Sequence, residues 1–61
     1  MKVVEHESGW IIVDCEPGLP ASKTRCYWTG KRWSIRIAQA LIYPTPADAE
    51  ADIPNLPPPP G

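Results

Sequence analysis

Two cysteines and one histidine are the residues of this chain whose side chains most often bind metal ions or act as nucleophiles. Cys15 and Cys26 are eleven positions apart, and His6 lies between two glutamates near the start of the chain. A structural zinc site needs four ligands, commonly with a Cys-x-x-Cys or His-x-x-x-His spacing, and neither spacing occurs here. We therefore predict no metal and no cofactor, and expect buried, reduced cysteines. A disulfide stays open as an alternative, because strands paired about a loop centred near residue 20 would place Cys15 opposite Cys26.

Acid–base or nucleophilic catalysis would need partners that the sequence does not supply. A serine or cysteine nucleophile requires a neighbouring base, and His6 is expected to be solvated near the chain terminus. The carboxylates Asp14 and Glu16 fall at a predicted strand end, where no deep cleft is expected to shift their pKa values. Thr29-Gly30-Lys31 lacks the upstream glycine of a phosphate-binding loop. These features predict a protein that is not an enzyme.

Basic residues concentrate in the middle of the chain. Residues 23–36 hold five of the six lysines and arginines and no acid, whereas residues 1–22 and 37–61 are acidic. Cations interleaved with aromatic rings are frequent at protein interfaces and also neutralise phosphates and stack on bases. The residues predicted to form a partner-binding face are Arg25, Tyr27, Lys31, Arg32 and Arg36. This prediction requires them to share one surface; the alternative is that the basic strip neutralises the acidic flanks within the fold.

Strand and turn signals predict a small antiparallel sheet that would position this face. Trp10–Cys15 is the clearest strand, being apolar on both faces, and weaker strands are expected at 2–7 and 24–29. Thr29-Gly30-Lys31-Arg32 predicts a hairpin turn that brings Trp28 opposite Trp33. Residues 34–43 fit either periodicity, and we predict a helical turn around 36–39 followed by a strand over 40–43.

The C-terminal part of the chain predicts one short helix and a tail. Thr45 is a suitable N-cap, Pro46 suits the first helical position, and Asp48 complements the helix dipole. Pro54 should end this helix, since the residue before a proline is disfavoured in a helix. Five of the nine prolines fall in the last eight positions, which predicts a polyproline II or disordered tail over 54–61. A single small domain is expected over residues 1–53.

The length of 61 residues limits the fold to a very small core. A multidomain enzyme, a barrel and a doubly wound sheet are excluded. We predict an α+β fold with a small, hairpin-rich antiparallel sheet of three to four strands and one short C-terminal helix. The residues expected to form its core are Trp10, Ile12, Trp28, Trp33 and Tyr43.

The longest apolar runs, Trp10–Val13 and Ala40–Tyr43, are far shorter than a membrane span. Met1-Lys2-Val3-Val4 is followed at once by Glu5, His6 and Glu7, so no apolar leader is expected. With only two cysteines in so small a chain, a disulfide scaffold is not indicated. The sequence therefore predicts a cytoplasmic protein with no membrane partner.

A series of aromatic, small and threonine positions across residues 10–51 resembles short reading frames of phages and prophages. The positions that carry the resemblance are Tyr27, Trp28, Thr29, Gly30, Trp33, Ala40, Tyr43, Thr45, Asp48 and Ala49. The resemblance implies a small antiparallel sheet with one C-terminal helix. Some phage proteins of this size bind and block a bacterial enzyme or defence complex, so it also implies a bacterial protein as the partner in the host cytoplasm.

The sequence as a whole predicts a non-enzymatic protein-binding protein that inhibits a bacterial host protein. One alternative is a small nucleic-acid-binding module that uses the hairpin over 23–36. A second alternative is a subunit of a phage particle or of a self-assembling oligomer such as a homodimer.

Overall fold

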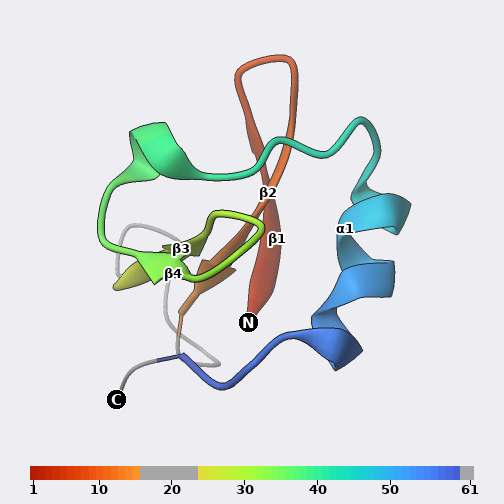
Figure 1. Ribbon diagram of the computed structural model, residues 1–61. Coiled ribbons are helices and arrows are strands. Elements are labelled where there is room, and N and C mark those ends of the chain that lie inside the picture. The colour runs from red at the N-terminus through yellow and green to blue at the C-terminus, as the bar shows by residue number, and fades with distance from the viewer. Residues whose placement is uncertain (16–23, 60–61) are drawn as a thin grey trace.

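The computed structural model describes residues 1–15 and 24–59. Within these ranges, four strands form one antiparallel sheet in the order β1-β2-β3-β4, and one helix packs against it (Figure 1). The elements are β1 Lys2–His6, β2 Gly9–Asp14, β3 Cys26–Trp28, β4 Trp33–Ser34 and α1 Pro46–Asp52, with the 3-10 turns η2 Ile37–Gln39 and η3 Ile53–Asn55. The prediction of an α+β fold with a small antiparallel sheet and one short helix is confirmed.

Strand β2 is buried on both of its faces, as its continuous apolar run predicts. Ile11, Ile12 and Val13 are each at most 1% exposed. Ile12 faces α1, whereas Ile11 and Val13 face the opposite side and pack with Cys15. Burying each of these side chains contributes about 1.5–3 kcal/mol, so β2 is the main source of hydrophobic stabilisation.

The α1 side of the sheet holds the larger core cluster, which also includes Ala49. The five residues predicted for the core all lie in or against this cluster. They are Ile12, Trp28 and Tyr43, which are buried, and Trp10 and Trp33, which are partly buried.

The β1–β2 connection is a two-residue turn at Glu7 and Ser8, with His6 paired to Gly9. Glu7 has a left-handed φ of 55°. A Cβ atom on Gly9 would meet Ile42 Cγ2 and would lie 2.7 Å from Tyr43 O. Glycine is therefore required at position 9 by the close approach of a second backbone.

The β3–β4 hairpin forms around the predicted turn. Trp28 pairs with Trp33 across the strands. The ring centroids are 5.4 Å apart and the ring planes make an angle of 60°, which is an edge-to-face arrangement. Gly30 has a φ of 98°, which an L side chain rarely adopts. An edge-to-face pair such as Trp28–Trp33 contributes about 0.5–1.5 kcal/mol of stability beyond that of its buried area.

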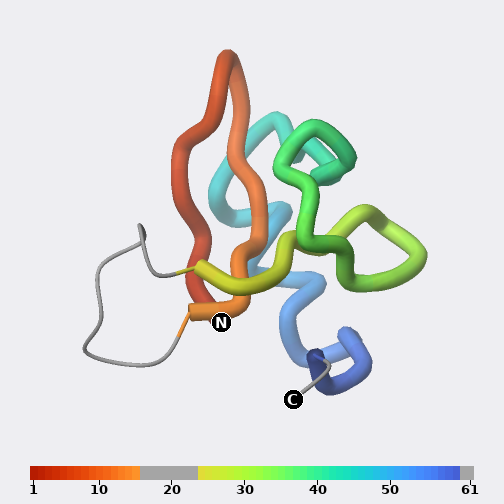
Figure 2. Tube along the Cα trace, turned by 90° about the vertical axis from the view of Figure 1, so that its left-hand side faces the viewer, coloured from red at the N-terminus to blue at the C-terminus, as the bar shows by residue number. Residues whose placement is uncertain are grey.

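Residues 35–43 wrap from the end of β4 back to β2. The predicted helical turn is present as η2, but the predicted strand over 40–43 is wrong except for a single bridge between Tyr43 and Trp10. Leu41 N–H donates to Trp28 O at 2.9 Å, whereas Tyr43 pairs with Trp10 of β2. The segment thus crosses from one strand to another instead of running along either. Figure 2 shows η2 and the β3–β4 turn protruding on the same side of the long β1–β2 hairpin.

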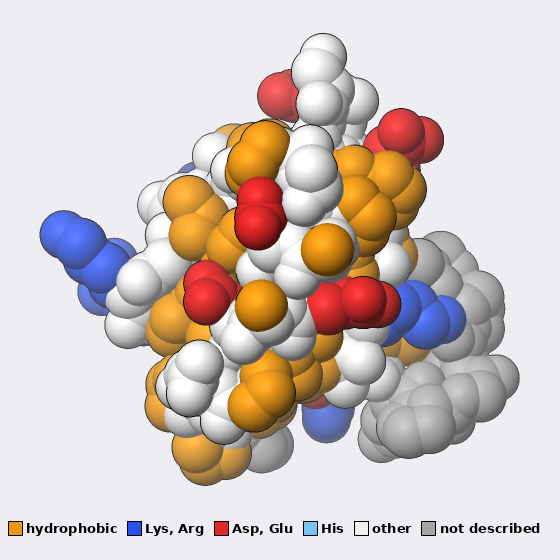
Figure 3. All heavy atoms as spheres, turned by 90° about the vertical axis from the view of Figure 1, so that its right-hand side faces the viewer, with side chains coloured by type: hydrophobic (Ala, Val, Ile, Leu, Met, Phe, Trp, Pro, Cys, Tyr) orange, Lys and Arg blue, Asp and Glu red, His pale blue; other side chains and the backbone are white. Residues whose placement is uncertain are grey.

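Helix α1 begins where the sequence predicts. Thr45 Oγ1 accepts a hydrogen bond from Asp48 N–H at 3.2 Å, and Pro46 occupies the first turn. Ala49 is fully buried, and its small side chain lets the helix lie close to the sheet. The view onto α1 shows an outer surface of acidic and apolar side chains (Figure 3).

Tyr43 links the sheet to α1. Its N–H donates to Trp10 O at 2.7 Å, and its hydroxyl donates to Asp52 Oδ2 at 2.8 Å. Burial, and then the hydrogen bond and negative charge of Asp52, raise the pKa of Tyr43 to about 12. The protonated phenol is therefore the form that the fold stabilises.

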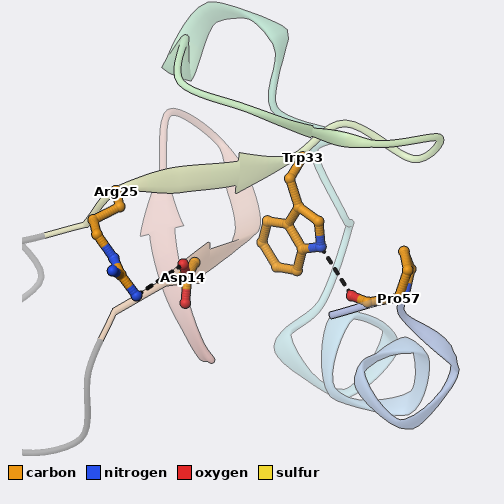
Figure 4. A network of polar contacts seen from close by, with 4 residues as sticks. All are labelled: Asp14, Arg25, Trp33 and Pro57. Carbon is orange, nitrogen blue, oxygen red and sulfur yellow. Dashed lines mark hydrogen bonds and ion pairs between the residues drawn. The ribbon is translucent and has the colours of Figure 1, made fainter. Parts of the chain in front are cut away.

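The chain stays packed beyond the predicted domain end at residue 53. Pro54 lies within η3, Leu56 packs against the core cluster, and Trp33 Nε1–H donates to Pro57 O at 3.0 Å (Figure 4). Apolar residues between the prolines thus bury surface against the core, and a proline carbonyl still accepts a hydrogen bond. The last positions of the predicted tail, residues 60 and 61, lie outside the described residues.

Candidate functional site

The two cysteines lie on opposite faces of the sheet. Asp14 pairs with Cys26, so Cys15 is one position out of register with it and its side chain points to the other side. Both cysteines are buried and carry thiols rather than a disulfide. The alternative in which they face each other as a disulfide is therefore wrong. Register follows the apolar pattern of β2 and not the midpoint of the connecting loop.

His6 does not join either cysteine. Its Nε2 atom lies 4.0 Å from the exposed carboxylate of Glu7. In the part of the chain that the structure describes, no three His, Cys, Asp or Glu side chains gather in a way that could hold a metal ion. Among the same residues, no helix is both long and apolar enough to cross a membrane.

Arg25, the first predicted partner-binding residue, is engaged within the fold. Its side-chain Nη2 atom lies 3.6 Å from Asp14 Oδ2 (Figure 4). Its backbone N–H donates to the backbone oxygen of Asp14 at 3.0 Å. The Asp14 side chain is buried, and Oδ2 accepts no hydrogen bond. A buried carboxylate without a counter-charge is costly, so Arg25 acts first as the counter-ion of Asp14. At this position the basic strip neutralises an acidic residue of the fold, as the alternative interpretation predicted.

Tyr27 is half-buried and packs against the cluster of Ile11, Val13 and Cys15. Its backbone pairs with Val13 on one side and with Ser34 on the other. This packing covers part of the ring and leaves less of it to stack on a base. Trp28, which is buried, and Trp33, which is partly buried, pack on each other.

Lys31, Arg32 and Arg36 are exposed and form no ion pair with any residue that the structure describes. Lys31 and Arg32 lie in the β3–β4 turn, at the other end of β3 from Arg25, which Figure 4 shows at the start of that strand. Arg36 follows β4, which runs antiparallel to β3 and returns toward the start of that strand. Figure 3 shows Lys and Arg side chains at separate places on the outline of the molecule. The five predicted residues are thus not equivalent. Lys31 and Arg32 lie together in the turn and Arg36 follows β4, all three exposed, whereas Arg25 is engaged by Asp14 and Tyr27 packs against the sheet.

Exposed apolar side chains accompany these three cations. Ile35, Ile37 and Leu41 are 79%, 41% and 38% exposed. Sequence reasoning missed them because Ile35 and Ile37 also fit the apolar positions of a buried strand or helix. These three cations and three aliphatic residues all fall within positions 31–42, and we use the name 31–42 surface for this set alone: Lys31, Arg32, Ile35, Arg36, Ile37 and Leu41.

The β3–β4 turn and η2 enclose an open hollow of about 450 Å³. Its lining residues are Thr29, Lys31 and Arg32 of the turn, and Gln39 of η2. The turn also approaches Leu41, whose Cδ2 atom would lie 3.2 Å from a Cβ on Gly30. The hollow is therefore lined by two of the cations of the 31–42 surface, and Leu41 lies next to the same turn.

No family model, curated protein or solved structure matches this chain. A function for it has to be inferred from its own residues.

Proposed function

We propose that this chain is a non-enzymatic protein-binding module that uses the 31–42 surface to bind an acidic, partly apolar segment of another protein. The observation that carries the proposal is that residues 31–41 expose three cations, none with an ion-pair partner among the described residues, together with three aliphatic side chains. Charge complementarity favours an acidic partner, and the aliphatic residues would add buried apolar area.

In so small a chain, an aliphatic residue that stays exposed is lost to the hydrophobic core. Ile35 is 79% exposed although the core is short of apolar residues. Isolated apolar side chains are common on protein surfaces, but a group rimmed by polar residues marks an interaction site. Arginine is also enriched at interfaces, because its planar head group binds carboxylates bidentately.

Nucleic-acid binding is the second candidate function, since the same three cations could neutralise phosphates. It is less well supported, because the nearby aromatic rings pack within the fold and the exposed neighbours of the cations are aliphatic. Stacking on unpaired bases requires exposed rings.

We extend the proposal to the biological role that the sequence resemblance implies. In this role the chain is encoded by a phage, and its partner is a bacterial enzyme or defence complex. Binding inhibits the partner by covering its active site or its nucleic-acid channel. A rigid hairpin with matched charge is sufficient for such occlusion.

Site-specific photo-crosslinking in bacterial lysate tests the proposal. A benzoylphenylalanine at position 35 should capture a discrete partner, whereas the same probe at position 50 on α1 should not. The charge reversal Arg36→Glu should reduce this capture about tenfold or more, since it replaces a favourable contact by a like-charge contact. Equal capture from positions 35 and 50, or capture that Arg36→Glu leaves unchanged, would refute the proposed surface.

A further inference from the structure

The hollow between the β3–β4 turn and η2 has a rigid wall. Thr29 Oγ1 accepts from Lys31 N–H at 3.4 Å and from Arg32 N–H at 3.1 Å, and it donates to Arg32 O at 2.8 Å. Thr29 N–H also donates to Arg32 O at 3.0 Å. The backbone that carries the two cations is therefore fixed before any ligand arrives, which reduces the entropic cost of binding.

The opposite wall presents a further hydrogen-bond donor. Gln39 Oε1 accepts from the Ser34 hydroxyl at 2.7 Å, and Ser34 Oγ in turn accepts from Arg36 N–H at 3.1 Å. With its oxygen engaged, the Gln39 carboxamide has its NH₂ group left to donate. The polar side-chain groups offered to a ligand are thus an ammonium, a guanidinium and an amide NH₂, all of them donors.

A site that offers only donors is matched by an anion. Among residues 1–15 and 24–59, no carboxylate lines the hollow and neither Lys31 nor Arg32 has an ion-pair partner. Hydrogen bonds from charged donors to a carboxylate are about twice as strong as neutral ones. A volume of about 450 Å³ admits a whole side chain rather than a bare ion.

We propose that this hollow is a carboxylate subsite that receives an aspartate or glutamate side chain of the partner protein. The inference rests on the proposed function, since it names the chemistry that the 31–42 surface recognises. A protein segment is favoured over a nucleic acid because Leu41, an exposed aliphatic residue, lies against the turn that carries Lys31 and Arg32. This aliphatic neighbour matches an apolar residue next to the acid, and a sugar–phosphate backbone has no equivalent group.

A pair of peptides provides the test. One is a blocked peptide that alternates glutamate with leucine, and its twin carries glutamine in place of each glutamate. Both are titrated at low salt into the ¹⁵N-labelled full chain. The expected shifts are at the Lys31 and Arg32 amides and the Gln39 side-chain NH₂, with the glutamate peptide binding at least tenfold more tightly. Lys31→Gln and Arg32→Gln should each weaken it severalfold, whereas the matched control Lys2→Gln on β1 should not.

Other outcomes overturn the inference. Equal affinity for the two peptides, with shifts at Ile37 and Leu41, would remove the carboxylate subsite and leave the docking surface standing. Binding of neither peptide would also overturn the subsite, and photo-crosslinking from position 35 then decides the proposed function independently. An oligothymidylate that shifts the same amides more strongly, with a steep salt dependence, would assign the hollow to phosphate and refute both statements.

Discussion

The phenol of Tyr43 makes a quantitative prediction about stability at high pH. Its pKa is raised to about 12 in the fold, against 10.0 for the unperturbed group. The folded state therefore disfavours ionisation, and this contribution is fully present below the unfolded pKa. It is lost as the pH rises from the unfolded towards the folded pKa. A tenfold difference in proton affinity corresponds to about 1.4 kcal/mol. The free energy of unfolding should therefore fall by about 1.4 kcal/mol between neutral pH and about pH 11. The total loss, above the folded pKa, should be about 2–3 kcal/mol.

Urea unfolding followed by tryptophan fluorescence, at intervals between about pH 8 and pH 11, measures this loss. The matched control is Tyr43→Phe, which keeps the buried ring and removes the titrating hydroxyl. It should lower stability at neutral pH by about 1 kcal/mol, through loss of the hydrogen bond to Asp52, and should flatten the alkaline slope. Asp52→Asn should keep most of the slope, because burial is the largest cause of the raised pKa. If Tyr43→Phe loses stability with pH as steeply as the parent protein, the alkaline transition belongs to other groups and the reasoning is wrong.

Three further predictions concern the framework of the sheet. Gly9→Ala should destabilise the chain by about 1–3 kcal/mol in urea unfolding, because its Cβ would lie 2.7 Å from Tyr43 O; Ser8→Ala, in the exposed turn, should change little. Glu7→Asn should raise the melting temperature, with a gain of about 0.5 kcal/mol, because asparagine tolerates the left-handed φ of 55° better; an unchanged or lower value would argue against strain at this turn. Arg25→Met should lower the free energy of unfolding by about 1–3 kcal/mol, because it leaves the Asp14 carboxylate buried without its counter-charge. Adding Asp14→Asn should restore part of the loss. A double variant no more stable than Arg25→Met alone would contradict the ion-pair account.

Local signals predicted those parts of the fold that short stretches of sequence determine. The cap at Thr45, the proline at position 46 and the glycine of the β3–β4 turn each act over a few residues. Helix α1 and the Trp28–Trp33 pair therefore form where the sequence places them. The burial of β2 on both faces was predictable for a related reason, because its apolar run leaves no polar side to expose.

Features that depend on distant contacts were not predictable in the same way. Whether Cys15 faces Cys26 is decided by a one-residue choice of register, which burial along β2 settles. The aliphatic residues of segment 35–43 suit a core strand, yet its backbone crosses between β2 and β3 and leaves Ile35 in solvent. The candidate site shares this difficulty, since its apolar half is visible only once these residues are known to be exposed.

The division of the basic strip separates stability from binding. Arg25 compensates a buried carboxylate, so its replacement should unfold part of the population and reduce any activity indirectly. Lys31, Arg32 and Arg36 are exposed and have no ion-pair partner among the described residues, and substitutions of such residues usually change stability by less than about 0.5 kcal/mol. Neutralising these three should therefore leave the urea midpoint unchanged while weakening attachment to an acidic partner. If neutralising the three cations lowered the urea midpoint as well as the binding, the cations would support the fold. The 31–42 surface would then not be supported as a binding site.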